Sequence, residues 1–175
     1  MSIQDLGAIG ELLAAIATLI TLVYLALQIK QNTKAVQNSV ADSCLSSAQT
    51  AVSSISNSPD NAYVWAMGAS NYDALSEHEK VQYRLKMIEL VNTSDLMYWN
   101  YRQGTLDEEI WARQETWTAG WLAHSNGLEL WDTYKAFVTP AFADHVDKNI
   151  RPRVDDLENA VSFYKSVIQT DEQPS

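Results

Sequence analysis

Cysteine is almost missing from this chain, since Cys44 is the only one in 175 residues. A single cysteine excludes an intrachain disulfide, so the sequence does not require an oxidising compartment. No histidine lies near Cys44 in the sequence. We therefore predict that it is a small residue packed between helices and not a nucleophile.

Basic residues are scarce as well, with 12 Lys and Arg against 22 Asp and Glu, and a formal net charge of −10. Binding of nucleic acid depends on clustered Lys and Arg that neutralise phosphates. The composition therefore argues against a nucleic-acid partner.

Sequence motifs typical of metal, redox or nucleotide-binding sites are also missing. The sequence contains no HExxH, CxxC, P-loop or GxGxxG pattern. None of His78, His124 and His145 has a glutamate three residues before it, so the di-iron Glu-x-x-His pattern is absent. The acidic run 107–109 is typical of a helix start. We predict no metal site, no cofactor and no enzymatic activity.

One long apolar run stands out against this background. Leu12 to Ile29 is 18 residues without a charge, about 27 Å as a helix, which suits a hydrocarbon core of roughly 30 Å. A secretion signal would begin with cations and end at a small-x-small site, and neither is present. A buried core helix is the other interpretation, but cores rarely need so long an uncharged run. The sequence predicts a single-pass membrane anchor over residues 5–29.

The flanking charges predict its orientation. Lys30 and Lys34 follow the run, and no cation precedes it. Because Lys and Arg near a span favour the cytoplasmic side, we expect the N-terminus outside and the remaining chain in the cytoplasm. The predicted location is the inner (cell) membrane of a bacterium.

The run is not uniformly apolar. Small and polar residues recur at alternating spacings of four and three, which places them within an arc of about 100° on a helix. Small residues let membrane helices approach closely, and polar ones hydrogen-bond between them. The pattern predicts a helix–helix interface, here called the seam, which consists of Gly7, Glu11, Ala14, Thr18, Thr21, Leu25 and Gln28.

Glu11 has three interpretations. At the headgroup boundary it costs little and suits a helix N-terminus. Repeated around an oligomer, it would form a carboxylate ring above Thr18 and Thr21 that favours cations. It could also pair with a partner subunit.

The rest of the chain predicts helices and no convincing strand, and therefore an all-α fold. The first helix continues past the span to about Ser56 as an extension over residues 30–57. Helix starts are indicated at Ser58–Pro59, at the capping box Ser76–Glu79 and at Thr139–Pro140. We predict a soluble domain of about five helices over 58–170 and a disordered tail over 171–175.

A possible buried polar network lies on the helix that begins at Ser76. An apolar stripe, expected to face inward, contains Val81, Leu85, Ile88 and Trp99. Asn92 and Asp95 fall at its centre, with Arg102 on the same side. A buried acid normally has a partner, so we predict an internal ion-pair or hydrogen-bond network, with a ligand-binding acid as the alternative.

The span ending in Gln28–Thr33, together with Arg102, Gly104, Leu106 and Asp107, resembles a widespread family of small bacterial proteins with an N-terminal transmembrane helix and a helical C-terminal domain. The resemblance covers about residues 5–147. It implies this architecture, a bacterial origin and an acid near position 95, and it implies no activity.

The leading hypothesis is a non-enzymatic anchored protein that self-associates through the seam and acts as a scaffold presenting an acidic domain. Two alternatives remain, namely an oligomeric channel with a Glu11 ring and an accessory subunit of a larger membrane complex. The expected partners are membrane lipid and either further copies of the chain or another membrane protein.

Overall fold

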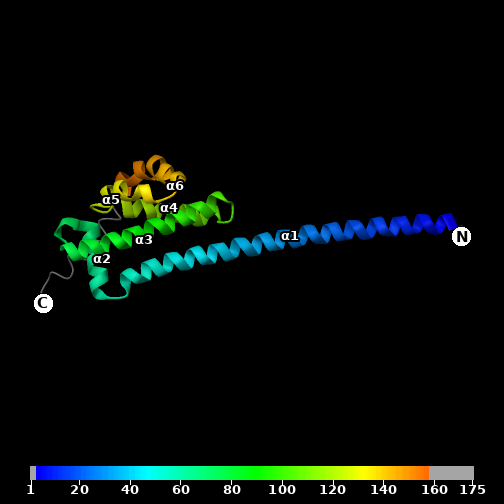
Figure 1. Cartoon of the computed structure of the whole chain (residues 1–175), viewed down its shortest axis with the longest axis horizontal. Coiled ribbons are helices and arrows are strands. Elements are labelled where there is room, and N and C mark those ends of the chain that lie inside the picture. Colours follow the sequence, from blue (N-terminus) through cyan, green and yellow to red (C-terminus); the bar gives the residue numbers. More distant parts are fainter. Residues whose placement is uncertain (1–2, 158–175) are drawn as a thin grey trace. The chain divides into compact units, whose positions relative to one another are not determined.

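A computed structural model describes residues 3–157. Within that range the chain is helical and contains no strand, which confirms the predicted all-α class with a long first helix (Figure 1). The predicted tail over 171–175 and residues 158–170 of the predicted domain lie outside the described residues.

The chain consists of two compact units, Met1–Ser39 and Val40–Ser175. The first unit is the N-terminal part of helix α1 (Ile3–Ser56), and the second contains the remainder of α1 and every later element. The division falls inside the segment 30–57 that the sequence assigned to an extension. Residues 40–56 therefore belong to the helical domain.

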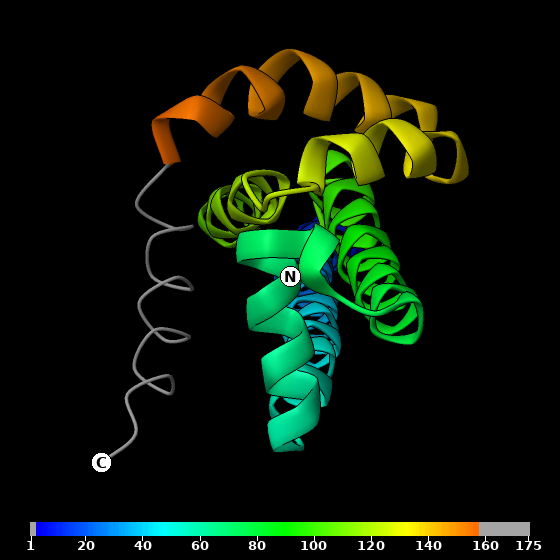
Figure 2. The ribbon, with the colours of Figure 1, turned by 90° about the vertical axis from the view of Figure 1, so that its left-hand side faces the viewer.

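The second unit is built from short and medium helices around one long helix, α3. Its elements after α1 are α2 (Pro59–Asn71), η1 (Tyr72–Ala74), α3 (Glu77–Arg102), α4 (Glu108–Leu122), α5 (Gly127–Tyr134), η2 (Lys135–Phe137), α6 (Pro140–His145), η3 (Val146–Ile150) and η4 (Arg151–Leu157). Figure 2 looks nearly along α3 and α4 and shows residues 127–157 covering one side of that pair.

The helix starts follow the capping signals in the sequence. Ser58 accepts a hydrogen bond from the backbone N–H of Asn61, with Pro59 next in the chain. Ser76 and Glu79 form the reciprocal capping box, and the Thr139 side chain caps α6. After α3, Gly104 adopts a φ of +70°, a conformation that costs glycine little. These boundary predictions are confirmed.

The last part of α1 packs antiparallel against α3. The Asn100 side-chain amide donates to Cys44 Sγ over 3.9 Å, and the Lys86 ammonium donates to Ser54 Oγ over 2.6 Å. Cys44 is buried, as predicted for a residue between helices. This pairing explains why the Ser-rich stretch of α1, whose helix propensity is mediocre, remains helical there.

Two apolar clusters fill the domain. One joins α4, α5 and α6 around Trp111, Trp131 and Phe142. The other joins α2 and α3 around Trp65 and Tyr83. Gly68 makes the second cluster possible, because a side chain at that position would collide with the Tyr83 ring.

The predicted inward face of α3 is wrong. The buried residues are Tyr83, Met87, Leu90, Val91, Ser94 and Met97. Apart from Val91 at the edge, they lie on roughly the opposite side of the helix from the stripe chosen above. Val81, Leu85 and Trp99 are 50, 60 and 53% exposed. Both faces repeat with spacings of four and three, so the pattern alone could not distinguish them.

Candidate membrane-spanning interface and polar clusters of the domain

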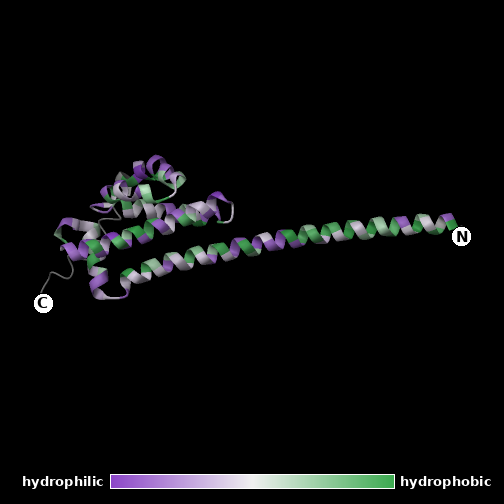
Figure 3. Ribbon diagram, viewed as in Figure 1, coloured by the Kyte–Doolittle hydropathy of each residue, from purple (hydrophilic) through white to green (hydrophobic). Residues whose placement is uncertain are grey.

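The first unit consists of an apolar helix with exposed side chains. Every described side chain between Ile3 and Ser39 for which burial is defined is exposed. Within the described residues, one helix is long and apolar enough to cross a membrane, and it lies near the N-terminus. Figure 3 shows the apolar and intermediate residues that dominate this part of α1.

The seam residues lie on one helical surface, because α1 is continuous through all seven of them. Two glycines lie in this part of α1, Gly7 in the seam and Gly10 beside it. A Cβ added at Gly7 or at Gly10 would meet no atom within 4 Å, so neither position is kept small by its own chain. Glycine in a helix interior costs up to about 1 kcal/mol relative to alanine. Both positions therefore leave room for close approach of another helix.

The polar seam residues satisfy much of their hydrogen bonding within the helix. Thr18 donates to the carbonyl of Ala14 over 2.9 Å, and Thr21 donates to that of Ala17 over 2.8 Å. The Gln28 side-chain amide donates to the Tyr24 hydroxyl over 2.7 Å. The threonines can thus lie in hydrocarbon without an unsatisfied donor, while each oxygen can still accept.

The predicted buried network at Asn92, Asp95 and Arg102 is wrong. Asn92 and Arg102 are exposed, and Asp95 is half-buried. Asp95 does have a partner, but the partner lies 44 residues away. Its two carboxylate oxygens accept from the backbone N–H of Thr139 over 2.9 Å and from the Thr139 hydroxyl over 2.5 Å. Arg102 instead lies over the Tyr98 ring, 6.0 Å from its centroid.

Asp95 is therefore a clamp between α3 and the start of α6. Thr139 caps α6, and Asp95 holds the backbone and the side chain of that cap together. The sequence pointed to an acid with a partner. It could not identify Thr139, because the contact forms only when α5 and η2 return the chain to α3.

A buried polar network does exist on α3, but it is centred on Ser94, the residue before Asp95. The side chains of Gln114 and Thr118 on α4 reach Ser94 Oγ over 2.9 and 3.1 Å, and Ser94 donates to the Leu90 carbonyl over 3.0 Å. All three side chains are at most 5% exposed. The sequence contains a signal for this network, namely a serine within the apolar repeat Tyr83, Met87, Leu90 and Met97. The network fixes the register between α3 and α4.

His124 is a buried titratable group, with 4% of its surface exposed. Its Nδ1 lies 2.7 Å from the Tyr83 hydroxyl, and the Trp65 ring meets it edge-on with centroids 5.0 Å apart. Burial lowers the pKa of His124 to about 3. The imidazole is therefore neutral at neutral pH and acts as a hydrogen-bonding core residue.

His145 pairs with an acid that is distant in sequence. Glu115 Oε1 lies 3.4 Å from His145 Nε2 and 3.5 Å from Arg153 Nη1. The neighbouring Asp144 contacts Lys148, and Asp147 accepts from the Trp131 indole. His145 Nε2 is buried, and the rings of Tyr98 and Trp111 lie against the imidazole. A substrate could not reach that nitrogen without displacing them, so the arrangement stabilises the contact between α4 and α6.

Cys44 is buried, and His78 is exposed beside Gln82. Burial raises the pKa of the Cys44 thiol, which disfavours the nucleophilic thiolate. A groove of about 220 Å³ between the end of α1, α2 and α3 is lined mainly by apolar groups, among them Ile55, Trp65 and Leu85. Lys86 also lines it, but its ammonium already contacts Ser54 and Glu89. In the part of the chain that the structure describes, no three His, Cys, Asp or Glu side chains gather to hold a metal ion.

Comparison of the chain with protein-family models, with curated proteins and with solved structures found no match.

Replacing Asp95 with Asn should destabilise the domain by about 1–2 kcal/mol, because the charge-assisted bonds to Thr139 are weakened. Thermal unfolding followed by circular dichroism would measure this change. Arg102→Gln is the matched control and should change the melting temperature little, since Arg102 is exposed. A larger loss from Arg102→Gln than from Asp95→Asn would contradict the observed clamp.

The free energy of unfolding should decrease as the pH is lowered, because of His124. Its folded pKa, about 3, lies below the value of about 6.5 expected in the unfolded chain. Between these values the unfolded chain binds a proton that the folded chain does not. The His124 contribution is therefore complete above pH 6.5 and is lost at up to about 1.4 kcal/mol per pH unit on acidification. Denaturant unfolding at pH 6.5, 5.5 and 4.5 would measure this slope.

The control for that measurement is His124→Asn, which retains a polar group near the Tyr83 hydroxyl and does not titrate. The free energy of unfolding of this variant should depend less steeply on pH, by the equivalent of about one proton bound on unfolding. An identical slope in the two proteins would exclude His124 as the titrating group.

Proposed function

We propose that this protein is a non-enzymatic, single-pass membrane protein of the bacterial cell membrane that self-associates through its span and presents a helical domain as a scaffold. The observation that supports this proposal most directly is the seam. Small and polar residues lie on one surface of an apolar helix that the described part of its chain leaves uncovered.

Association through this surface follows from how membrane helices attract one another. Lipid tails are as apolar as leucine, so the seam must gain from close packing and from polar contact. Gly7, Gly10 and Ala14 allow close approach. Thr18 and Thr21 add compact oxygens that can still accept. Leucine and isoleucine side chains at positions 12, 13, 16, 19 and 20 cover the remaining surface and suit contact with lipid.

The helical domain supports a scaffold better than an enzyme. Its buried histidine is neutral, its second histidine is enclosed by aromatic rings, and its cysteine is buried. Beyond Lys34 the chain carries 20 acidic and 10 basic residues. This excess favours partners with positively charged surfaces over anionic ones.

The proposed orientation places the N-terminus outside and the helical domain in the cytoplasm, as Lys30 and Lys34 indicate. An alkaline phosphatase fused after Ser175 should be inactive, because it folds only outside the cytoplasm, and a cytoplasmic reporter at the same site should be active. A sandwich fusion that places the phosphatase before Leu6 should be active. The reverse pattern would overturn the orientation.

The seam is tested by Thr18→Leu combined with Thr21→Leu. The span remains apolar, so insertion should persist, but bulky side chains then occupy the contact surface. Each lost polar contact should cost on the order of 1 kcal/mol per interface. Native mass spectrometry in detergent should show a shift to smaller species.

Leu19→Ala with Leu22→Ala is the control on the lipid-facing side and should leave assembly unchanged. An unaltered oligomer in the threonine double variant would exclude the seam as the interface. A wild-type protein that is monomeric would instead favour the accessory-subunit alternative.

A channel is the second candidate, because Glu11 lies on the seam and a closed ring would bring its carboxylates to one mouth. Cation flux through liposomes that is lost in Glu11→Gln, with the oligomer intact, would support it. Absence of flux in the wild-type oligomer would exclude it.

A further inference from the structure

Among the described residues, a long apolar stripe of α3 is exposed. The stripe consists of Val81, Leu85, Ile88, Asn92 and Trp99, with Leu96 at its edge. Four of its apolar members are 49–60% exposed, although α3 buries its opposite face in the core. Large apolar side chains that are aligned along a helix in this way mark an interaction surface.

The spacing along the stripe is that of a coiled-coil seam. In heptad notation, Leu85, Asn92 and Trp99 occupy a positions, and Val81 and Ile88 occupy d positions. A single asparagine at a central a position is the residue that fixes register and pairing in two-stranded coiled coils. Asp95 falls at the next d position, but its carboxylate is engaged by Thr139 of its own chain.

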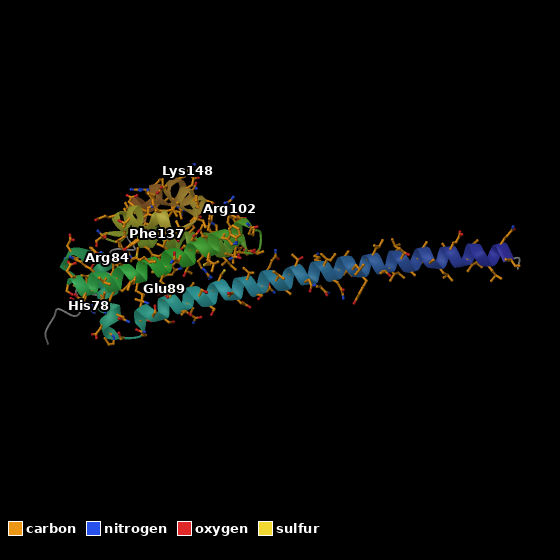
Figure 4. The ribbon with its side chains drawn as sticks, in the orientation of Figure 1. His78, Arg84, Glu89, Arg102, Phe137 and Lys148 are labelled. Atoms are coloured by element: carbon orange, nitrogen blue, oxygen red, sulfur yellow. The ribbon has the colours of Figure 1, made fainter. Side chains whose placement is uncertain are left out.

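Charged groups at the edges of the stripe favour one kind of partner. Arg84 and Glu89 come from its two edges (Figure 4). They occupy a g position and the following e position, which face each other across a parallel pair of identical helices. Arg84 is held at the edge by its bond from Nε to the Tyr72 hydroxyl, over 2.6 Å. Glu89 contacts Lys86 through Oε2, and its second oxygen can accept from another donor.

We propose that α3 pairs in parallel with α3 of a second copy of this chain. The pair would place Asn92 against the second copy's Asn92, Leu85 against the second copy's Leu85, and each Arg84 beside the second copy's Glu89. An antiparallel pair would set a positions against d positions, so Asn92 would meet an apolar residue and the two charges would not face each other.

This interaction rests on the proposed function, because the stripe is too short to act alone. From Val81 to Trp99 it is about 27 Å long, and one helix pair of that length buries less than the roughly 800 Å² per partner of a standard interface. Two chains already joined through their spans would meet at an effective concentration in the millimolar range, which makes such a weak contact sufficient.

Cysteine cross-linking of the full chain in membrane vesicles tests the proposal. In a Cys44→Ser background, Leu85→Cys and Asn92→Cys should each form disulfide-linked dimers on mild oxidation. The yields should exceed by about fivefold or more that of Lys148→Cys, an exposed position away from the stripe (Figure 4). An antiparallel pair would cross-link at no more than one of the two stripe positions and would overturn the parallel arrangement.

A charge exchange tests the predicted edge pairs. Arg84→Glu and Glu89→Arg, each introduced into the Asn92→Cys chain, should lower the cross-linking yield by about threefold. The double exchange should restore it. If the single variants acted only by disturbing the fold of one chain, the double exchange would not restore the cross-linking yield. A double variant whose yield is as low as that of the single variants would therefore refute the edge pairs.

Thr21→Cys in the same background separates the two proposals. A cross-link at Thr21 without any at Leu85 or Asn92 would overturn the α3 pairing and leave the proposed function standing. Cross-links on α3 without one at Thr21 would support the α3 pairing and overturn the transmembrane seam.

Discussion

The apolar surface of the first unit is the constraint on which the remaining interpretation depends. Ten Leu, Ile and Val side chains between Leu12 and Ile29 are exposed. Covering side chains of this kind is worth about 2 kcal/mol each, or about 20 kcal/mol in total. That gain is available to any partner or phase that buries the surface, and the proposed membrane span and its seam are built on it.

Within the helical domain, α3 has the comparable role. Its buried face meets α2 through Tyr83 and Gly68, the end of α1 through Asn100 and Cys44, and α4 through Ser94. The Asp95 clamp then attaches the start of α6. One helix thus contacts α1, α2, α4 and α6, and the second apolar stripe on it requires a separate explanation.

Both proposals depend on residues that repeat along one surface of a helix and pair with a second helix. In the span, small and polar residues follow a spacing of four and three, and on α3 large apolar residues follow the same spacing around one asparagine. The first pattern suits lipid, where close packing drives association, and the second suits water, where apolar burial drives it. Each surface alone is modest. Two weak contacts in one chain reinforce each other because the first raises the effective concentration for the second.

The amino-acid sequence by itself determined the elements that depend on local chemistry. Ser58, the Ser76–Glu79 box and Thr139 act through bonds within a few residues, so their roles could be predicted correctly. The all-α class and the membrane-length helix followed from composition and periodicity alone. The tertiary structure decided which of two equally spaced faces of α3 is buried, because that choice depends on where α2, α4 and the end of α1 lie. It also decided that Asp95 bonds Thr139 and that Glu115 meets His145, since contacts between residues 44 and 30 positions apart exist only after the chain has folded back on itself.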